Sequence, residues 1–189
     1  MRKLMVSEYL TLDGVMEDPG GHEIFRDDNW HFPFWGEEDV MQYKLEELLE
    51  ADALLLGRRT YQEFAPVWPH VSDDTGFADR MNSLPKYVVS TTLQEVPWHN
   101  SRLLKGEVAE AVSKLKQQEG QAILLSGSGE LARMLMESDL IDEYRLLVHP
   151  VVVGKGASFF KNITAKLTLK LVETKTFQKG IVLLCYQPA

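Results

Sequence analysis

The sequence predicts an α/β domain with a mixed, mostly parallel sheet of about eight strands. Short apolar segments alternate with amphipathic ones along the chain, an order typical of parallel strands connected by helices. After residue 166 two alternating segments flank Gln178-Lys179-Gly180, which predicts a C-terminal antiparallel hairpin. With 189 residues and 44% hydrophobic content, the chain suits a single domain over residues 1–189.

The first third of the chain contains two strands, a long loop and a helix. Residues 3–10 alternate and run into the turn Leu12-Asp13-Gly14, which predicts a strand. Residues 17–36 combine prolines and glycines with aromatic residues, so we expect an irregular binding loop or lid there. Residues 37–50 place apolar side chains at helical spacing after several acids, which predicts a helix. Residues 53–56 then form a buried strand that leads into a short helix.

The remainder repeats the alternation of strand and helix. Residues 85–90 predict a strand, residues 107–119 an amphipathic helix, and residues 122–125 a buried strand. A helical segment follows the turn Ser126-Gly127-Ser128-Gly129, and residues 143–148 form the next strand.

The turn at residues 126–129 has two interpretations. The first amides of a helix lack partners and carry the positive end of the helix dipole, so glycines there can admit a phosphate or pyrophosphate. Alternatively, Ser128 is a good N-cap, and such turns often connect a strand to a helix without a ligand. The turn also fits G-x-G-x-x-A, but the next strand does not end in the acid that a Rossmann fold places on the ribose.

Three predicted strands end in residues suited to a phosphorylated dinucleotide. Parallel sheets bind ligands at the carboxyl ends of their strands. These ends carry Gly57-Arg58-Arg59-Thr60, Ser90-Thr91 and the turn at residues 126–129. Arginine offers paired planar donors for a 2'-phosphate, and the glycine turns suit a pyrophosphate. The alternative is that Arg58 and Arg59 only pair with surface carboxylates.

The composition argues against several other functions. A net charge of −8 and a pI near 5.2 disfavour a surface for nucleic acid or membranes, so we expect a small-molecule partner. Cys185 is the only cysteine and the five histidines lack zinc-binding spacing, so no metal is expected. Glu8 interrupts the N-terminal apolar stretch where a signal peptide would be apolar, and no apolar run could cross a bilayer. The expected compartment is the cytoplasm.

An ordered set of motifs resembles a known family. The set comprises Leu12-Asp13-Gly14, Gly57-Arg58-Arg59-Thr60-Tyr61, Gly127-Ser128-Gly129-Glu130-Leu131 and LIDEYRLLVHPVVVGKG at residues 140–156. With these motifs the chain is similar to dihydrofolate reductase-like proteins, specifically to the C-terminal reductase domain of the bifunctional riboflavin-biosynthesis deaminase-reductase. The resemblance extends over nearly the whole chain and implies a dihydrofolate reductase-like fold.

The resemblance also implies a function and a set of site residues. It implies an NADPH-dependent reductase of a small pterin- or pyrimidine-like heterocycle, or of a ribosylamino substrate such as 5-amino-6-(5-phosphoribosylamino)uracil. The cofactor-binding positions carried over from the family are Gly57, Arg58, Arg59, Thr60, Ser90, Thr91, Gly127, Ser128, Gly129, Glu130 and Leu131. Asp13 is the candidate catalytic group beside the nicotinamide. Trp35 and Glu38 are candidate substrate-binding residues, although no proline precedes an acid there as in folate enzymes.

Two other interpretations stay open. A nucleotide-binding or regulatory protein could keep the same cleft without catalysis, because the sequence shows no clear catalytic acid. An acidic scaffold with a protein-binding aromatic loop would have no affinity for dinucleotides. The resemblance further implies a homodimer, with residues 146–160 and the C-terminal hairpin as contact surfaces.

Overall fold

The structure is a computed structural model, and it describes residues 1–17, 29–164 and 166–189. Its strands are β1 (Lys3–Thr11), β2 (Ala51–Gly57), β3 (Lys86–Val89), β4 (Ser101–Leu104), β5 (Ala122–Ser126), β6 (Glu143–His149), β7 (Leu169–Thr176) and β8 (Val182–Pro188). Its helices are α1 (Glu38–Glu50), α2 (Arg58–Phe64), α3 (Phe77–Ser83), α4 (Val108–Gln117) and α5 (Gly129–Glu137), with short 3-10 turns η1 (Phe32–Phe34), η2 (Trp68–His70) and η3 (Gln178–Gly180).

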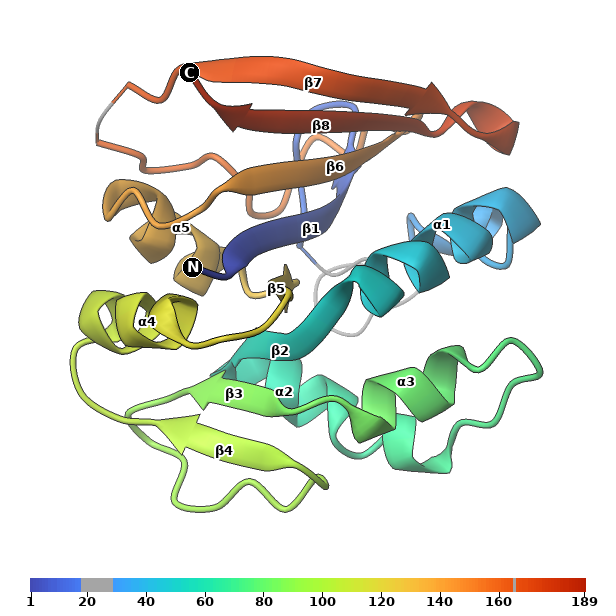
Figure 1. Cartoon of the computed structure of the whole chain (residues 1–189). Coiled ribbons are helices and arrows are strands. Elements are labelled where there is room, and N and C mark those ends of the chain that lie inside the picture. The colour runs from blue at the N-terminus through green and yellow to red at the C-terminus, as the bar shows by residue number, and fades with distance from the viewer. Residues whose placement is uncertain (18–28, 165) are drawn as a thin grey trace.

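The strands form one sheet in the order β4-β3-β2-β5-β1-β6-β8-β7. Neighbours from β4 to β6 are parallel, whereas β8 is antiparallel to both β6 and β7. Figure 1 shows this stack from β4 at the bottom to β7 at the top. The prediction of a mostly parallel sheet of about eight strands with a C-terminal hairpin is therefore confirmed.

Helices cover both faces of the sheet, because successive side chains of each strand point to opposite faces and both sets must be buried. Along β1, Leu4, Val6 and Leu10 pack into a core formed with α4 and α5. Met5 points to the other face and packs into a second core, to which α1, α2 and α3 contribute. Figure 1 shows α4 and α5 on one side of the strands and α1 and α3 on the other. Burial of apolar surface in both cores is the main stabilising term.

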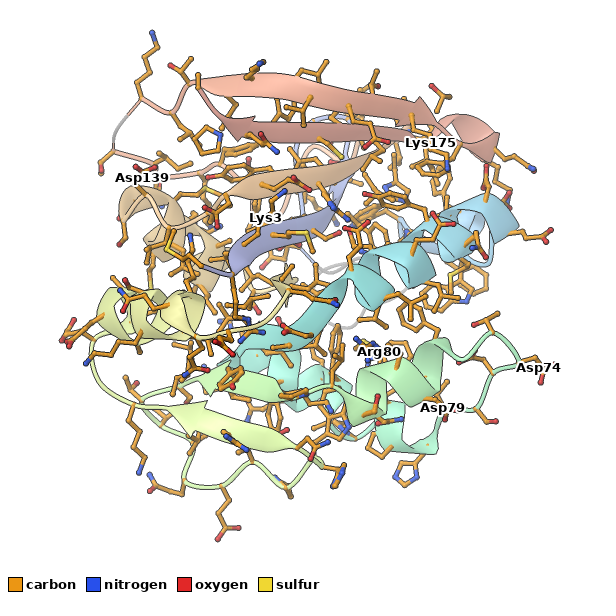
Figure 2. All side chains as sticks on the ribbon, viewed as in Figure 1. Lys3, Asp74, Asp79, Arg80, Asp139 and Lys175 are labelled. Atoms are coloured by element: carbon orange, nitrogen blue, oxygen red, sulfur yellow. The ribbon has the colours of Figure 1, made fainter. Side chains whose placement is uncertain are left out.

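The sequence did not reveal β4 or α3. β4 has only four residues at the edge of the sheet, and α3 has seven, so neither is long enough to show a clear period. Contacts distant in sequence fix α3 instead. Arg80 donates to the carbonyl of Ala51 at 2.6 Å, and Figure 2 shows it reaching from α3 toward the junction of α1 and β2.

The carboxyl edge of the sheet contains a step between β1 and β5. β1 pairs with β5 only as far as Ser7↔Ser126, but it continues along β6 to Thr11↔His149. Among the strands in residues 1–17, 29–164 and 166–189, residues 8–11 therefore have a neighbour on one side only. We call this place the step.

The predicted dimer surface needs one correction. Leu146 and Leu147 lie in β6, between β1 and β8, and are 4% and 0% exposed, so they cannot contact a partner. Exposed apolar side chains nearby are Val152, Phe160, Leu171 and Val172. The homodimer itself stays a prediction. Among the described residues, no helix combines the length and apolar character needed to cross a membrane.

Candidate active site

The turns that follow β2 and β5 are hydrogen-bonded to each other. Since these strands are neighbours, their carboxyl ends meet. The amide of Gly57 donates to Oγ of Ser128 at 2.8 Å, and that hydroxyl donates to Oγ1 of Thr60 at 2.8 Å. Residues 57–60 and 126–129 thus form one unit, which we call the glycine junction. Four of the predicted cofactor residues meet here, namely Gly57, Thr60, Gly127 and Ser128.

Glycine is required in this junction by space and by backbone angle. Gly127 has φ +61°, and a Cβ atom there would lie 3.2 Å from Oγ1 of Thr60. A Cβ atom on Gly57 would lie 3.2 Å from Ser128. A side chain at Gly127 would be strained by its backbone angle, and one at either glycine would require the neighbouring side chain to shift by a few tenths of an ångström.

Ser128 does not cap α5, so that part of the sequence interpretation is wrong. Its backbone is left-handed, with φ +67°, and its side chain makes no capping bond because it is used across the junction. The first-turn amides of α5 therefore lack a side-chain partner at the N-cap. Their direction and the helix dipole favour an anion at this point.

The other predicted cofactor residues of these two turns differ in their surroundings. Arg58 and Arg59 are exposed, and neither forms an ion pair within the described residues; Arg58 donates to Oε1 of Gln62 at 2.9 Å. The alternative that both only pair with carboxylates therefore has no support. Glu130 is exposed in the first turn of α5. Leu131 is 4% exposed and belongs to the core beneath α5, so only its backbone faces the turn.

A surface pocket of about 320 Å³ lies at the ends of β3 and β4. Ser90 and Thr91, two of the predicted cofactor residues, line it together with Lys105 and Gly106 at the end of β4. Ser90 is held in place because its Oγ accepts the amide of Leu93 at 2.9 Å. Lys105 was not predicted, since β4 itself was not. The pocket begins one strand from Arg58, because Val89 in its wall pairs with Gly57.

Asp13 lies at the turn after β1 and has its carboxylate fully engaged. It accepts the hydroxyl of Thr11 at 2.6 Å and the amides of Gly154 at 2.8 Å and Val153 at 3.4 Å. These bonds, above all the one from Thr11, lower the pKa of Asp13. An acid that is already ionised cannot supply a proton at neutral pH. Its hydrogen bonds join the turn after β1 to the segment that follows β6.

The two predicted substrate residues are exposed and are not part of the glycine junction. Trp35 is 64% exposed and meets the ring of His31 edge-on, with centroids 5.6 Å apart. Glu38 is exposed in the first turn of α1. Most of the loop predicted at residues 17–36 falls on residues 18–28, which lie outside the described residues.

On the α1 face, the step holds a buried ion pair. Lys44 pairs with Glu47, and its Nζ donates to Oγ of Ser7 at 2.7 Å and lies 5.6 Å from the ring centroid of Tyr9. Glu47 is fully buried, and no described residue forms a hydrogen bond with its Oε1. Burial opposes the charge on Lys44, but Glu47 and Tyr9 raise its pKa overall, so the ammonium form persists.

Two histidines extend this cluster along the step. Nδ1 of His31 lies 3.2 Å from Nε2 of His149, and the ring of His31 stacks on Tyr9 with centroids 4.5 Å apart. Nδ1 of His149 faces the carbonyls of Leu10 and Leu147, so it must carry the proton, and His31 donates to Nε2. Burial and the neighbouring His149 lower the pKa of His31 to about 4, so both rings are neutral at pH 7.

Glu8 is the least expected group at the step. It is 5% exposed, and its Oε1 has no hydrogen-bond partner in the part of the chain that the structure describes. It stands on β1 directly after the last pairing with β5, between Val6 and Leu10 on the face of α4 and α5. Burial raises the pKa of Glu8 to about 8, against the lowering effect of Lys44 on α1 and Arg133 on α5. The sequence carries a signal for this residue, because Glu8 interrupts the apolar alternation of residues 4–10.

Metal ligands do not gather at this site. No group of three or more His, Cys, Asp or Glu side chains that could hold an ion is found in residues 1–17, 29–164 and 166–189.

Comparison with known proteins assigns the family. A family described as the RibD C-terminal domain matches residues 2–183. The chain belongs to this family. Among RibD C-terminal domain relatives, the uncharacterized protein YyaP of Bacillus subtilis is 30% identical over 98% of this chain and 94% of its own length.

Solved structures share the fold of this RibD C-terminal domain protein. The diaminohydroxyphosphoribosylaminopyrimidine deaminase/5-amino-6-(5-phosphoribosylamino)uracil reductase of Thermotoga maritima has a TM-score of 0.68 and 17% identity, with coverage of 100% of this chain and 57% of its own. Dihydrofolate reductase of Enterococcus faecalis, complexed with NADP(H), has a TM-score of 0.62 and 15% identity, with coverage of 98% and 96%. The predicted dihydrofolate reductase-like fold is thus confirmed.

Proposed function

We propose that the protein is an NADPH-dependent reductase of a small heterocyclic or ribosylamino substrate. Membership in the RibD C-terminal domain family supports a reductase of this general kind, and the solved neighbours include two named reductases. The observation that carries the proposal is the glycine junction, where two turns are hydrogen-bonded together and the first amides of α5 have no side-chain cap.

The residues along the carboxyl edge fit the parts of a phosphorylated dinucleotide in order. The pocket with Ser90 and Lys105 at β3 and β4 suits the adenosine end, and Arg58 on the neighbouring turn suits a 2'-phosphate. The glycine junction suits the pyrophosphate. The step between β5 and β1 is then left for the nicotinamide. From β3 to β1 the edge crosses three strand spacings, about 14 Å, a distance that an extended dinucleotide can cover.

The bound nicotinamide would supply a hydride, and the chain's own residues would position the reactants and handle the proton. Ser128 fixes the two phosphate-binding turns relative to each other. Lys44, which is paired with Glu47, and Tyr9, whose ring stacks on His31, close the α1 face of the step. We propose no role in proton transfer for Asp13, because its carboxylate is ionised and occupied.

The test is a pair of titrations with NADPH and NADH, followed by tryptophan fluorescence and by calorimetry. Arg58→Ala should weaken NADPH by roughly thirtyfold, about 2 kcal/mol, and leave NADH nearly unchanged, because only NADPH has the 2'-phosphate. Arg102→Ala is the matched control, since Arg102 is an exposed arginine on β4 outside the pocket wall. No binding of either nucleotide would reject the proposal.

One observation favours a second candidate, a nucleotide-binding protein without catalysis. Neither Asp13, which is occupied, nor Glu38, which is exposed, offers the acid expected of a reductase. The two candidates differ in NADPH oxidation when flavin precursors, pterins and related heterocycles are offered. Binding without oxidation across that panel would favour the second.

A further inference from the structure

A buried carboxyl group without a hydrogen bond is costly. An unpaired polar group in an apolar core destabilises the fold, so its presence calls for an explanation. Glu8 is such a group: it is 5% exposed, and its Oε1 has no partner among the described residues. Replacement by leucine would continue the pattern of Leu4, Val6 and Leu10 on this face of β1. Packing alone therefore does not explain the residue.

The register places Glu8 at the same level as the glycine junction. Ser7 pairs with Ser126, so the next residue of β1, Glu8, stands level with Gly127, where the chain turns away into α5. On the β5 side Glu8 consequently borders the step, while on the other side it pairs with Leu146 of β6. The charges that act on it come from both layers of helices, Lys44 and Glu47 on α1 and Arg133 on α5, which is consistent with a position in the gap that β5 leaves.

We propose that Glu8 is the proton donor of the site, held neutral at the step beside the redox-active end of the cofactor. This inference rests on the proposed function. Lys44 and Arg133 would then stabilise the carboxylate that remains after proton transfer. Burial and the nearby Glu47 keep the acid protonated beforehand.

The proposed step reduces a C=N or C=O double bond of the substrate to a single bond. The substrate carbon gains a hydride from the reduced nicotinamide, and the substrate nitrogen or oxygen gains the proton of Glu8 as the double bond becomes single. The O–H bond of Glu8 breaks, the cofactor is left oxidised, and water restores the proton on Glu8. Glu8 thereby fills the role for which the sequence offered no acid.

The inference can be tested without knowing the substrate. An oxidised nicotinamide ring carries a positive charge and a reduced one does not, so NADP⁺ should lower the pKa of an adjacent Glu8 and NADPH should not. Binding of NADP⁺ should then release a proton, and its affinity should rise with pH up to the pKa of free Glu8, about 8. Both nucleotides have the same phosphates, so the titration of those phosphates cancels in the ratio of the two dissociation constants.

The experiment measures that ratio from about pH 6 to about pH 9 and measures proton release by calorimetry in two buffers of different ionisation enthalpy. In the wild type, the ratio of the Kd of NADP⁺ to that of NADPH should fall about tenfold for each unit by which the ring lowers the pKa of Glu8. Glu8→Gln should give a flat ratio and no differential proton release. Glu46→Gln, an exposed acid on α1, should behave as the wild type.

A flat ratio in the wild type, or an unchanged slope in Glu8→Gln, would overturn the assignment of Glu8 while leaving the reductase proposal standing. Failure of both nucleotides to bind would reject the proposed function and this inference with it. Circular dichroism checks that Glu8→Gln is folded; if it is not, the differential proton release of the wild type still decides.

Discussion

The glycine junction and the step lie side by side on the sheet edge, yet they are built in opposite ways. The junction uses main-chain amides and small side chains from two short motifs, residues 57–60 and 126–129. The step uses charged and aromatic side chains from β1, α1, β6 and the segment before α1, most of them buried. The difference suggests a division of labour, because a diphosphate can be held by backbone groups, whereas proton transfer requires side chains whose pKa is tuned by burial.

The largest effect should come from the buried ion pair of the step. Lys44→Met leaves Glu47 buried without its partner and should lower the free energy of unfolding by about 4 kcal/mol. The double variant Lys44→Met/Glu47→Leu should recover most of that loss, because both charges are removed. Urea unfolding measures both. Equal stability of the single variant and the wild type would show that the pair is solvated and that the step is not the dry site described above.

A smaller effect, with a definite sign, is expected from Glu8 when pH is changed. The pKa of Glu8 is raised in the folded state from 4.5 to about 8, so the folded protein binds more protons than the unfolded chain between these values. The free energy of unfolding should therefore fall as pH rises through this window, by about 1.4 kcal/mol for each pH unit inside it. Glu8→Gln should lack this fall, so its stability relative to the wild type should increase with pH. A parallel decline in both proteins during urea unfolding at several pH values would contradict the burial of an unpaired acid.

The glycine junction should respond more modestly. Ser128→Ala removes the bonds to the amide of Gly57 and to Oγ1 of Thr60 and should cost about 1–2 kcal/mol of stability. The same change should weaken NADPH and NADH by similar factors, because the pyrophosphate is common to both. Thermal unfolding and nucleotide titration report the two effects, with Ser138→Ala as a control at the exposed end of α5. A loss confined to NADPH would mean that Ser128 contacts the 2'-phosphate instead.

The smallest effect is expected at Asp13. Asp13→Asn should lower stability by about 1 kcal/mol or less, since the carboxylate is exposed and mainly fixes the turn against Val153 and Gly154. NADPH affinity should be unchanged. If a substrate is found and this variant loses turnover while its Kd for NADPH and its melting temperature are retained, Asp13 would regain the catalytic role that the family resemblance implied.

The sheet and the glycine junction could be predicted because both depend on patterns of residues that are close together in the sequence. Apolar periodicity marks β1, β2, β5 and β6, and the glycines at 57, 127 and 129 stand next to the strands they follow. Short elements escaped prediction: without β4, Lys105 could not be placed at the pocket. The use of the Ser128 hydroxyl also depends on Gly57, which is distant in sequence.

The step could not be predicted in the same way. Its groups meet only after folding, as His31 meets His149 and Lys44 meets Ser7. Glu8 breaks a clear alternation, but the sequence alone does not place that break beside the glycine junction. Its position at the step depends on the pairing of β1 with β5, which ends one residue before Glu8.

The most direct test of the central claim is a crystal structure of the complex with NADP⁺. We expect the 2'-phosphate beside Arg58 and the pocket of Ser90, the pyrophosphate on the glycine junction, and the nicotinamide ring in the step next to Glu8. A ring placed elsewhere, with the step still closed by Tyr9 and the side chains around it, would contradict both the division of labour and the assignment of Glu8.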